Sequence, residues 1–522
     1  MRDFRSKLLE YYGLSEEEYN ELLKPISLEN LPNSFNCKDM ESCVNFIKQK
    51  INNGTKVLIY GDYDCDGIIS TAIIYLTLKA ESFIPGYYIP FRETDGYGLT
   101  KNNVDKFFDL GYRLLILVDN GITLVDEINY AREKGMDVVI IDHHIKGNML
   151  PNANYILHPI YSNFVDVNMS AGALSFFFSK SFLGYFDRYL LVLGAISIIS
   201  DLMEMKKYNK NLVKLGIQIL NEDKFFNIIH LINLKNSEPI NEDDISMDFV
   251  PKINAIGRLI DDNKLFNVVK YLINKDDKEF IVKTAQWIED INSYRKDLLL
   301  SIGDRFKNVN SSKSSLVVIE DNLKEGLTGL LASKLMNEYN KPTVVFAKQK
   351  NNPYIYKGSV RSKPGFDIDA ALKELSPILE TFGGHKNAGG LSIKEQNFDK
   401  FCTIFEELSN KYPFIDDEKY IKINLNDINL ENYKLIRTLS PFGQGFKKPQ
   451  FKLENYNTDF FNYSKNCLHI ITKLNPTSSM VYFNYNHDIL SSKFVDLLGT
   501  FELNIFKGFY SVQFTINNFI KK

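Results

Sequence analysis

The segment KVLIYGDYDCDG, residues 56–67, joins a short apolar run to a loop that holds three aspartates. Asp62, Asp64 and Asp66 lie within five residues, and carboxylates at this spacing repel one another. Cations bound by the loop would offset that cost. The following residues, IISTAIIYLTLKA (68–80), are apolar and helical in pattern. The segment therefore predicts a strand, a ligand-bearing loop and a helix, which is the start of a βαβ unit.

The same alternation continues along the chain. Apolar runs at 86–91, 113–121 and 137–144 are separated by helical segments, which predicts a parallel sheet buried on both faces. A second α/β unit begins at 314–320, and short β runs after residue 413 predict a small antiparallel barrel or sandwich. We expect five parts: a helical lead-in (1–50), a first α/β domain (51–264), a connecting helix (265–310), a second α/β domain (311–412) and a β domain (413–522).

Composition narrows the class of protein without naming a function. The chain has 522 residues and a net charge of −3, so charge gives no global sign of nucleic-acid binding. Its five cysteines have no CxxC spacing, which favours reduced thiols and no zinc site. The charged N-terminus has no signal-peptide core, and no apolar run approaches the roughly 18 residues of a membrane span. We expect a cytoplasmic protein without a membrane segment.

Acidic and imidazole side chains follow the predicted strands. Asp119 ends LLILVD, and Asp142, His143 and His144 end VVIIDHH. Because parallel strands present their carboxyl ends along one edge, these residues and the three loop aspartates should share one crevice. Asp201, after an apolar helical segment, is a further contributor. Carboxylates with imidazoles suit Mn²⁺ or Mg²⁺, and so many acids indicate two ions that clamp a phosphate for hydrolysis.

The three aspartates also allow two other readings. An EF-hand calcium loop fits at four positions, but its twelfth position is Ile73 where a bidentate glutamate is required, and a strand precedes it. A solvated acidic turn is the common state of such a loop. The acidic residues at the other strand ends favour the metal site instead.

At these residues the chain resembles the DHH phosphoesterase superfamily, and more closely its RecJ-type single-strand-specific exonucleases. Eight motifs carry the resemblance over some 400 residues. They are GDYDCDG (61–67), VDNG (118–121), DHH (142–144), SDLM (200–203), NAIGRL (254–259), GSVRS (358–362), GGHKNAGG (383–390) and PFGQGF (441–446). The resemblance implies a DHH domain with a parallel sheet, a connecting helix, a DHHA1 domain and a C-terminal OB-like β-barrel.

The resemblance also implies roles for the acidic residues. Asp64 and Asp119 would bind one ion, while Asp66, Asp119, His143 and Asp201 would bind the other. His144 would stabilise charge at the scissile phosphate or protonate the leaving oxygen. Asp142 would orient a histidine. The family often has a histidine where this chain has Tyr60, and Asp62 would replace that ligand or hold a coordinated water.

Further residues would contact phosphate. Arg258, Ser359 and Arg361 resemble the family's pocket for a terminal 5′-phosphate, and arginine suits this role through its planar charged fork. Gly384 and His385, in a glycine-dense string where backbone N–H groups can approach a phosphate, would face the metals. The other reading of that string is a tight turn between a helix and a strand. Arg92 would meet a phosphate, and Tyr97 would stack on a base or pack.

The C-terminal region would bind single strands through stacking and basic side chains, as OB-folds do. Phe460, Phe461 and Tyr463 are equally consistent with core residues, and Lys447 and Lys448 with a solvated pair. The family usually shows asparagine where this chain has Phe446.

We therefore expect a 5′→3′ exonuclease on single-stranded DNA that uses Mn²⁺, or Mg²⁺, and serves repair and recombination. It would be a monomer and would act alongside a helicase and single-strand-binding protein. The alternatives are a phosphodiesterase for nano-RNA, cyclic dinucleotides or phosphoadenosine phosphate, and a binding factor without catalysis. The small-substrate relatives usually lack a C-terminal β domain, and the intact acidic residues oppose the binding factor.

Overall fold

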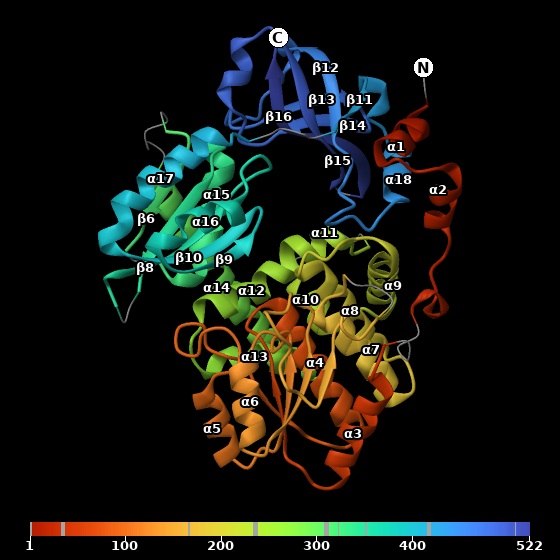
Figure 1. Ribbon diagram of the computed structural model, residues 1–522. Coiled ribbons are helices and arrows are strands. Elements are labelled where there is room, and N and C mark those ends of the chain that lie inside the picture. The colour runs from red at the N-terminus through yellow and green to blue at the C-terminus, as the bar shows by residue number, and fades with distance from the viewer. Residues whose placement is uncertain are drawn as a thin grey trace.

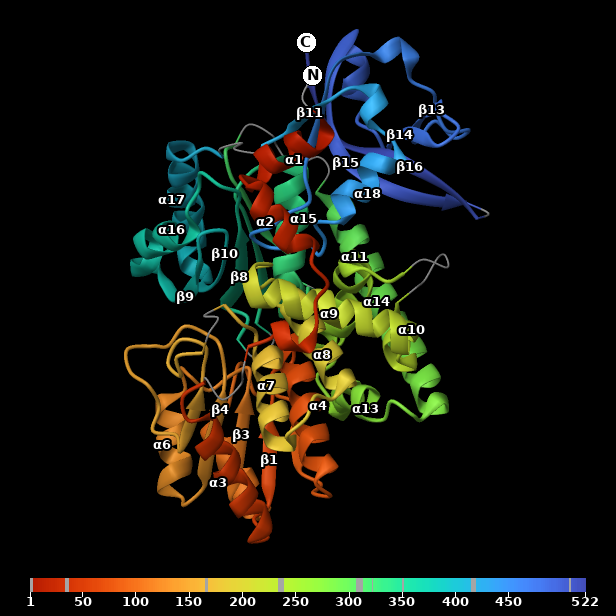
Figure 2. The ribbon, with the colours of Figure 1, turned by 90° about the vertical axis from the view of Figure 1, so that its right-hand side faces the viewer.

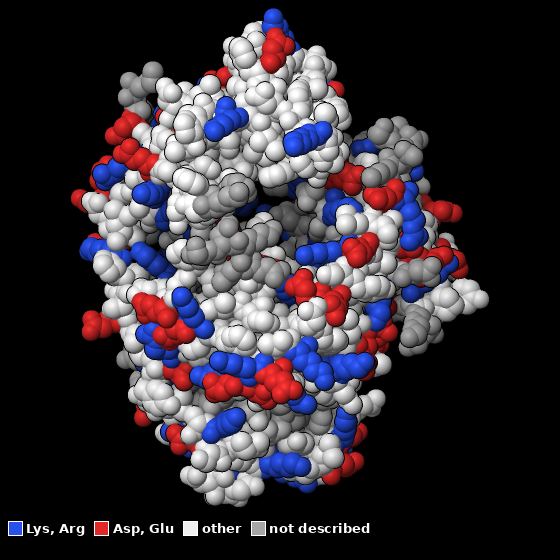
Figure 3. All heavy atoms as spheres, turned by 180° about the vertical axis from the view of Figure 1, so that it is seen from behind, with Lys and Arg blue, Asp and Glu red and all other residues white. Residues whose placement is uncertain are grey.

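The structure is a computed structural model that describes residues 3–32, 37–164, 168–232, 239–306, 313–321, 323–349, 352–414, 419–506 and 508–522. Three sheet-containing units make up the chain, and a helical layer lies between the first and the last (Figure 1). Seen from behind, the surface is hollowed below the C-terminal unit, and Lys and Arg side chains lie near the hollow (Figure 3).

The first sheet is parallel throughout and has the order β2-β1-β3-β4-β5. Its strands are β1 (Val57–Tyr60), β2 (Gly86–Tyr88), β3 (Leu114–Val118), β4 (Asp137–Ile141) and β5 (Tyr155–Leu157). The predicted parallel sheet is thus confirmed. Its central strands are buried runs of Val, Ile and Leu because helices cover both faces.

Alternate residues of each strand enter different cores. Val57 and Ile59 pack with the helices that follow the DYDCDG loop, whereas Leu58 and Tyr60 pack on the opposite face. One face carries α3 (Met40–Asn52), α4 (Cys65–Ala80), α7 (Ala171–Leu183) and α8 (Arg188–Ser200). The other carries α5 (Lys101–Asp109) and α6 (Val125–Glu133).

A helical layer and a long helix follow the first sheet. The layer comprises α9 (Lys207–Asp223), α10 (Phe226–Leu231), α11 (Glu242–Asp244), a π-helical turn (Ile245–Phe249), α12 (Val250–Leu259) and α13 (Phe266–Ile273). The expected connecting helix is α14, which runs over Lys278–Arg305. It leads into the second unit (Figure 2).

The second unit is a mixed sheet of order β6-β7-β8-β10-β9. Its elements are β6 (Leu316–Ile319), α15 (Thr328–Tyr339), β7 (Thr343–Lys348), β8 (Ile355–Arg361), α16 (Ile368–Leu375), β9 (Leu379–His385), β10 (Ala388–Lys394) and α17 (Phe398–Lys411). The GGHKNAGG string forms the end of the antiparallel β9–β10 hairpin. The alternative reading of this string as a turn between a helix and a strand is therefore wrong.

The C-terminal unit is one six-stranded sheet of order β11-β12-β15-β16-β14-β13. Its elements are β11 (Ile421–Ile423), α18 (Leu430–Arg437), β12 (Phe451–Asn457), β13 (Ile470–Asn475), β14 (Ser478–Tyr482), β15 (Phe494–Phe506) and β16 (Phe509–Lys521). Two pairings, β11 with β12 and β14 with β16, are parallel, so the expected all-antiparallel arrangement is corrected to a mixed one. The sheet is OB-like, but the described pairings do not close it into a barrel.

The first helices of the chain pack on this last unit. Helices α1 (Phe4–Tyr12) and α2 (Glu16–Leu23) lie beside the C-terminal sheet (Figures 1 and 2). Phe4 stacks on Phe451 and Phe501 at ring distances of 5.9 and 6.1 Å. Of the residues grouped above as a helical lead-in, those in α3 therefore join the first core and those in α1 and α2 join the last.

Candidate metal centre and anion site

Neighbouring elements bring the predicted ligands together in two groups. Asp62, Asp64 and Asp119 each offer a carboxylate oxygen within 4.8 Å of the others, and the candidate ligand atoms of Asp66, His143 and Asp201 lie equally close together. Asp119 directly follows β3 and adopts a left-handed backbone with φ of 61°. This conformation is rare outside glycine and is found at functional sites, where it directs a side chain.

Asp64 and Asp66 are fixed by the start of α4. Asp64 is the N-cap of the helix and accepts a hydrogen bond from Gly67 N–H at 3.0 Å. Asp66, in the first turn of the helix, points to a different helix end. Its two oxygens accept hydrogen bonds from Ala171 N–H (3.0 Å) and Gly172 N–H (2.9 Å), the first residues of α7. The positive end of the α7 dipole thus helps to hold this buried carboxylate.

His143 and Asp201 complete the second group. His143 Nε2 lies 3.2 Å from Asp119 Oδ1, 3.3 Å from Asp201 Oδ2 and 3.8 Å from Asp66 Oδ2. Asp201 is the C-cap of α8, so the end of that helix places its side chain at the sheet edge. Three carboxylates therefore surround one imidazole nitrogen.

Asp142 organises the DHH loop. Its Oδ1 accepts from His143 N–H (2.7 Å) and lies 2.8 Å from His144 Nδ1, while Oδ2 accepts from Ile122 N–H at 3.0 Å. Burial opposes ionisation of Asp142, but the bond from His144 and its charge lower the pKa of Asp142 to about 2. The same contact outweighs burial at His144 and raises its pKa to about 9. An ionised Asp142 thus orients a proton-bearing His144.

The cluster holds more buried negative charge than its surroundings neutralise. Burial, followed by repulsion from neighbouring aspartates, raises the pKa of Asp62, Asp66, Asp119 and Asp201 above the ordinary range. Burial lowers the pKa of His143 to about 3, which leaves a neutral imidazole. Asp62 Oδ1, Asp119 Oδ1 and His143 Nε2 are buried without a hydrogen-bond partner among the described residues. Buried polar atoms without partners are costly, so this donor set fits divalent cations.

Tyr60 lies outside the cluster. It points to the opposite face of the sheet, where its hydroxyl donates to Gly98 O at 2.8 Å and its ring stacks on Tyr88. The side chain is fully buried there. Of Tyr60 and Asp62, only Asp62 therefore lies with Asp64 and Asp119 in the first group of candidate ligands.

The NAIGRL segment supports the acidic loop from α12. Asn254 Oδ1 accepts from Cys65 N–H at 2.8 Å, which fixes the loop at the start of α4. A Cβ at Gly257 would lie 1.9 Å from Tyr63 O, so only glycine allows this contact. The next residue, Arg258, donates to Gly326 O in the second unit at 2.9 Å. One short segment thus joins the acidic loop to the DHHA1-like unit.

Four arginines gather at this junction. Burial, then repulsion from Arg92, lowers the pKa of Arg258 to about 10, and Arg295 and Arg361 contribute further repulsion. Arg92 lies 4.3 Å over the Tyr63 ring, and its Nε, like that of Arg295, is buried without a hydrogen-bond partner in the described chain. Mutual repulsion between buried cations is relieved by an anion, so the arrangement fits a phosphate.

Ser359 and Arg361 reach this junction from β8. Ser359 Oγ lies 2.8 Å from Thr328 Oγ1 at the start of α15. A Cβ at Gly329 would come within 2.6 Å of Arg361 Nη2, so the arginine crosses the first turn of that helix. Both predicted contacts thus lie beside a helix N-terminus, where anions are favoured.

The remaining predicted contacts are peripheral. Gly384 and His385 are exposed at the end of the β9–β10 hairpin, and no described residue forms an ion pair with His385. Tyr97 is partly exposed, and its hydroxyl lies 3.5 Å from His144 Nε2. In the C-terminal unit Phe461 is buried, whereas Phe460 and Tyr463 are exposed. Lys448 pairs with Asp243 and Glu502.

Several residues that shape the site have no signal of their own in the sequence. Ser197 of α8 hydrogen-bonds to Asp66 Oδ1, and Gly172 permits the close approach of α7 because a Cβ there would lie 2.4 Å from Ser197 Oγ. His158 is buried and donates through Nε2 to His144 O at 2.9 Å, since its Nδ1 accepts from Ile160 N–H. Metal-site residues are generally held by hydrogen-bonding partners, so partners of this kind are expected, but their positions are not predictable from sequence.

Comparisons with known proteins agree with this architecture. Residues 56–188 match the DHH family N-terminal domain, 312–411 the DHHA1 domain and 421–518 the RecJ OB domain. The single-stranded-DNA-specific exonuclease RecJ of Bacillus subtilis is 29% identical over 81% of this chain, and the match covers 55% of that protein. RecJ of Haemophilus influenzae is 27% identical over 94% of this chain and 92% of its own length.

A solved structure shows the same fold. RecJ from Thermus thermophilus in complex with Mn²⁺ superposes with a TM-score of 0.83 at 21% identity, covering 99% of this chain and 76% of that one. Asp201 and the NAIGRL segment lie between the residues matched by the first two family models, and the fold comparison spans this region as well. The chain therefore belongs to the DHH/DHHA1 phosphoesterase superfamily, in the RecJ-type family that joins these two domains to an OB domain.

Proposed function

We propose that this chain is a metal-dependent exonuclease that removes nucleotides from the 5′ end of single-stranded DNA. The observation that carries the proposal is the partly buried cluster of five aspartates and two histidines at the carboxyl edge of the first sheet, with an arginine site beside it. The relatives with the same domain order are named single-stranded-DNA-specific exonucleases.

Two divalent cations fit the cluster, and its ligand types favour Mn²⁺ and also suit Mg²⁺. Asp62, Asp64 and Asp119 would hold one, and Asp66, Asp119, His143 and Asp201 the other. Ions bound there supply charge neutralisation and water activation for phosphodiester hydrolysis. Asp119 would serve both ions, because it belongs to the first group and its Oδ1 lies 3.2 Å from His143 Nε2 of the second.

His144 is the proposed proton donor and charge stabiliser. Asp142 accepts the bond from Nδ1, so Nε2 is free to face a phosphate oxygen or the leaving oxygen. Tyr97, whose hydroxyl approaches the same Nε2, would share that contact.

The arginine site would select the strand end. Arg258, Ser359 and Arg361 would bind the terminal 5′-phosphate between α12 and the second unit, with Arg92 nearer the acidic loop. Gly384 and His385 would approach a substrate phosphate from the β9–β10 hairpin. Because the terminal phosphate carries more negative charge than an internal one, this site favours ends over continuous strands.

The cellular setting is part of the proposal. The enzyme would act as a monomer in the cytoplasm, process ends and gaps during repair and recombination, and work with a helicase and single-strand-binding protein. In the described part of the chain every helix is too short or too polar to cross a bilayer.

The test is a hydrolysis assay with Mn²⁺ on end-labelled single strands, duplexes, dinucleotides and cyclic dinucleotides. The proposal expects rapid release of nucleotides from 5′-phosphorylated single strands only. Equal turnover of a dinucleotide and a long strand would identify a small-substrate phosphodiesterase instead. Binding without hydrolysis would identify a non-catalytic factor.

A further inference from the structure

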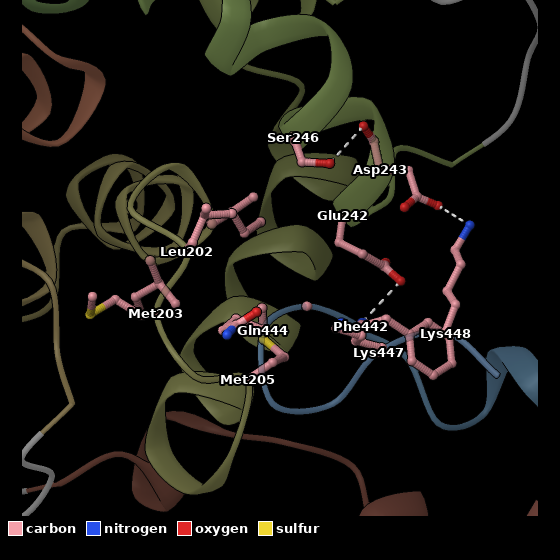
Figure 4. Close-up of a pocket in the computed structure, with 13 residues that line it drawn as sticks. Leu202, Met203, Met205, Glu242, Asp243, Ser246, Phe442, Gln444, Lys447 and Lys448 are labelled. Carbon is pink, nitrogen blue, oxygen red and sulfur yellow. Dashed lines mark hydrogen bonds and ion pairs between the residues drawn. The ribbon is translucent and has the colours of Figure 1, made fainter. Parts of the chain in front are cut away.

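A pocket lies where the segment after Asp201 meets the C-terminal unit (Figure 4). Its walls include Leu202 and Met203 on one side, Ser246 on another, and Phe442, Gln444 and Lys447 on a third. The last three belong to the PFGQGF segment and the lysines after it. This motif has no role in the cluster described above.

Backbone contacts join the wall after Asp201 to the wall formed by the PFGQGF segment. Met205 N–H donates to Gln444 O at 2.7 Å, and Gly443 N–H donates to Phe446 O at 3.0 Å to close a tight loop. A Cβ at Gly443 would lie 3.0 Å from Met205 Cε. The loop therefore fits against the segment after Asp201, and the pocket is built into the fold.

One wall of the pocket follows a metal-centre residue directly in the sequence. Leu202 directly follows Asp201, whose carboxylate lies 3.3 Å from His143 Nε2. Neighbouring Cα atoms are about 3.8 Å apart, so a phosphodiester at the cluster places its adjoining nucleoside within reach of the pocket.

An apolar side chain of the pocket wall is exposed. Leu202 is 71% exposed. An exposed apolar surface beside a charged catalytic edge indicates a ligand surface. The face of a nucleobase is a suitable partner, since apolar and aromatic side chains hold bases in single-strand sites without reading sequence.

The pocket carries one cation that the described residues leave unpaired. Glu242 is neutralised by Arg437, with Nη–Oε distances of 2.9 and 3.0 Å, and Lys448 lies between Asp243 at 2.6 Å and Glu502 at 3.2 Å. Lys447 is exposed, and no described residue forms an ion pair with its ammonium group. That ammonium group is therefore available to a backbone phosphate.

The two ends of the acidic cluster differ in what lies beside them, and this difference gives the bound strand a direction. Asp64 lies by Arg258, in the arginine site, whereas Asp201 lies by the pocket. We infer that the pocket holds the base of the nucleotide on the 3′ side of the scissile phosphate, with Lys447 against the strand backbone. The inference rests on the proposed function, because the arginine site sets where the 5′ end lies.

The test measures binding of short 5′-phosphorylated single strands by fluorescence anisotropy in Mn²⁺, with a non-hydrolysable linkage at the first phosphodiester so that no hydrolysis occurs. Strands carry an abasic nucleotide at the second, third or fourth position. For the unchanged protein, one position should weaken binding roughly tenfold, as expected for a lost apolar contact of this size. Leu202→Ala should bind the intact strand roughly tenfold more weakly and lose nothing further at that position. Leu110→Ala, a leucine 53% exposed at the end of α5, is the matched control and should behave as the unchanged protein.

A second variant tests the charge. Lys447→Gln should reduce the slope of log affinity against log salt by about 0.7 for a single strand. The inference would be overturned if an abasic nucleotide weakened binding by Leu202→Ala as much as by the unchanged protein at every position tested. An unchanged salt slope for Lys447→Gln would also overturn it. If the same protein in Mn²⁺ fails to hydrolyse ordinary strands, the proposed function is wrong, while the binding data still decide the pocket.

Discussion

Two groups of buried charge lie near the segment that joins α8 to α9. One is the metal centre, whose carboxylates carry more negative charge than the surrounding residues neutralise. The other is the junction with the C-terminal unit, where each buried charge has a partner. In the metal centre, burial raises the pKa of Asp62, Asp66 and Asp119, and repulsion from Asp64 adds to each shift. At the junction with the C-terminal unit, Glu242 is equally buried but accepts from Arg437, Ser440 Oγ and Phe442 N–H. There the charge of Arg437 outweighs burial and holds the pKa of Glu242 below its ordinary value. Buried charge that the protein pairs serves structure, and buried charge that it leaves unpaired serves ligands.

The largest expected effect is on catalysis. Asp119→Ala removes the carboxylate shared by both proposed ions, so hydrolysis of single-stranded DNA should fall at least about 10³-fold. Strand binding should stay measurable, because the arginine site is intact. Steady-state hydrolysis and anisotropy on the same preparation check this. Substantial residual hydrolysis would contradict the shared role.

Glu242→Ala should have the largest effect on stability. It breaks an ion pair whose carboxylate is buried and leaves the partly buried Arg437 without its partner, which costs about 3–5 kcal/mol of unfolding free energy. Urea denaturation measures the loss. Glu222→Ala, which breaks an exposed pair with Arg188, is the control and should cost less than about 1 kcal/mol. Similar losses of unfolding free energy in the two variants would show that the buried ion pair contributes no more to stability than the exposed one.

Ser197→Ala should weaken the binding of Mn²⁺ at the metal centre. Ser197 does not face the ions but holds Asp66 in place, and loss of such a partner typically weakens metal binding by about 10- to 100-fold. Mn²⁺ titration by calorimetry checks the value. Ser409→Ala, a buried serine in α17 that donates to Phe405 O, should leave Mn²⁺ affinity unchanged.

The last expected effect is a dependence of stability on pH. Lys210 is buried at the junction, donates to Leu439 O and Pro441 O, and has its pKa lowered to about 7 by burial, with Glu242 opposing and Lys214 adding to the shift. Between pH 7 and about 10 the unfolded chain therefore binds more protons than the folded one, so this group adds stability as pH rises. The stability difference between the unchanged protein and Lys210→Met should grow in favour of the former from pH 7 to about 10. A difference that is flat across this range would show that Lys210 stays charged in the fold.

Much of the site follows from local sequence. Asp119, Asp142 and Asp64 each stand at a strand end or helix start, where the period of the apolar pattern fixes their place, and the parallel sheet then gathers them on one edge. The side of the sheet that Tyr60 faces follows from the same alternation, since it points opposite to Ile59.

Other features depend on contacts that no local pattern encodes. The α7 N-terminus reaches Asp66 across 105 residues of sequence, and Gly257 matters only because Tyr63 O passes close to it. The parallel pairing of β14 with β16 likewise depends on strand order, which short alternating runs leave open. For that reason the antiparallel expectation for the C-terminal unit is wrong, although its β runs are where the sequence predicts them.

Anomalous diffraction from crystals soaked in Mn²⁺ tests the central claim most directly. Two peaks are expected, one among Asp62, Asp64 and Asp119 and the other among Asp66, Asp119, His143 and Asp201. The Asp119→Ala protein should show neither at full occupancy. A single Mn²⁺ peak at saturation, or peaks that leave the unpaired oxygens of Asp62 and Asp119 without a cation, would contradict the two-metal account.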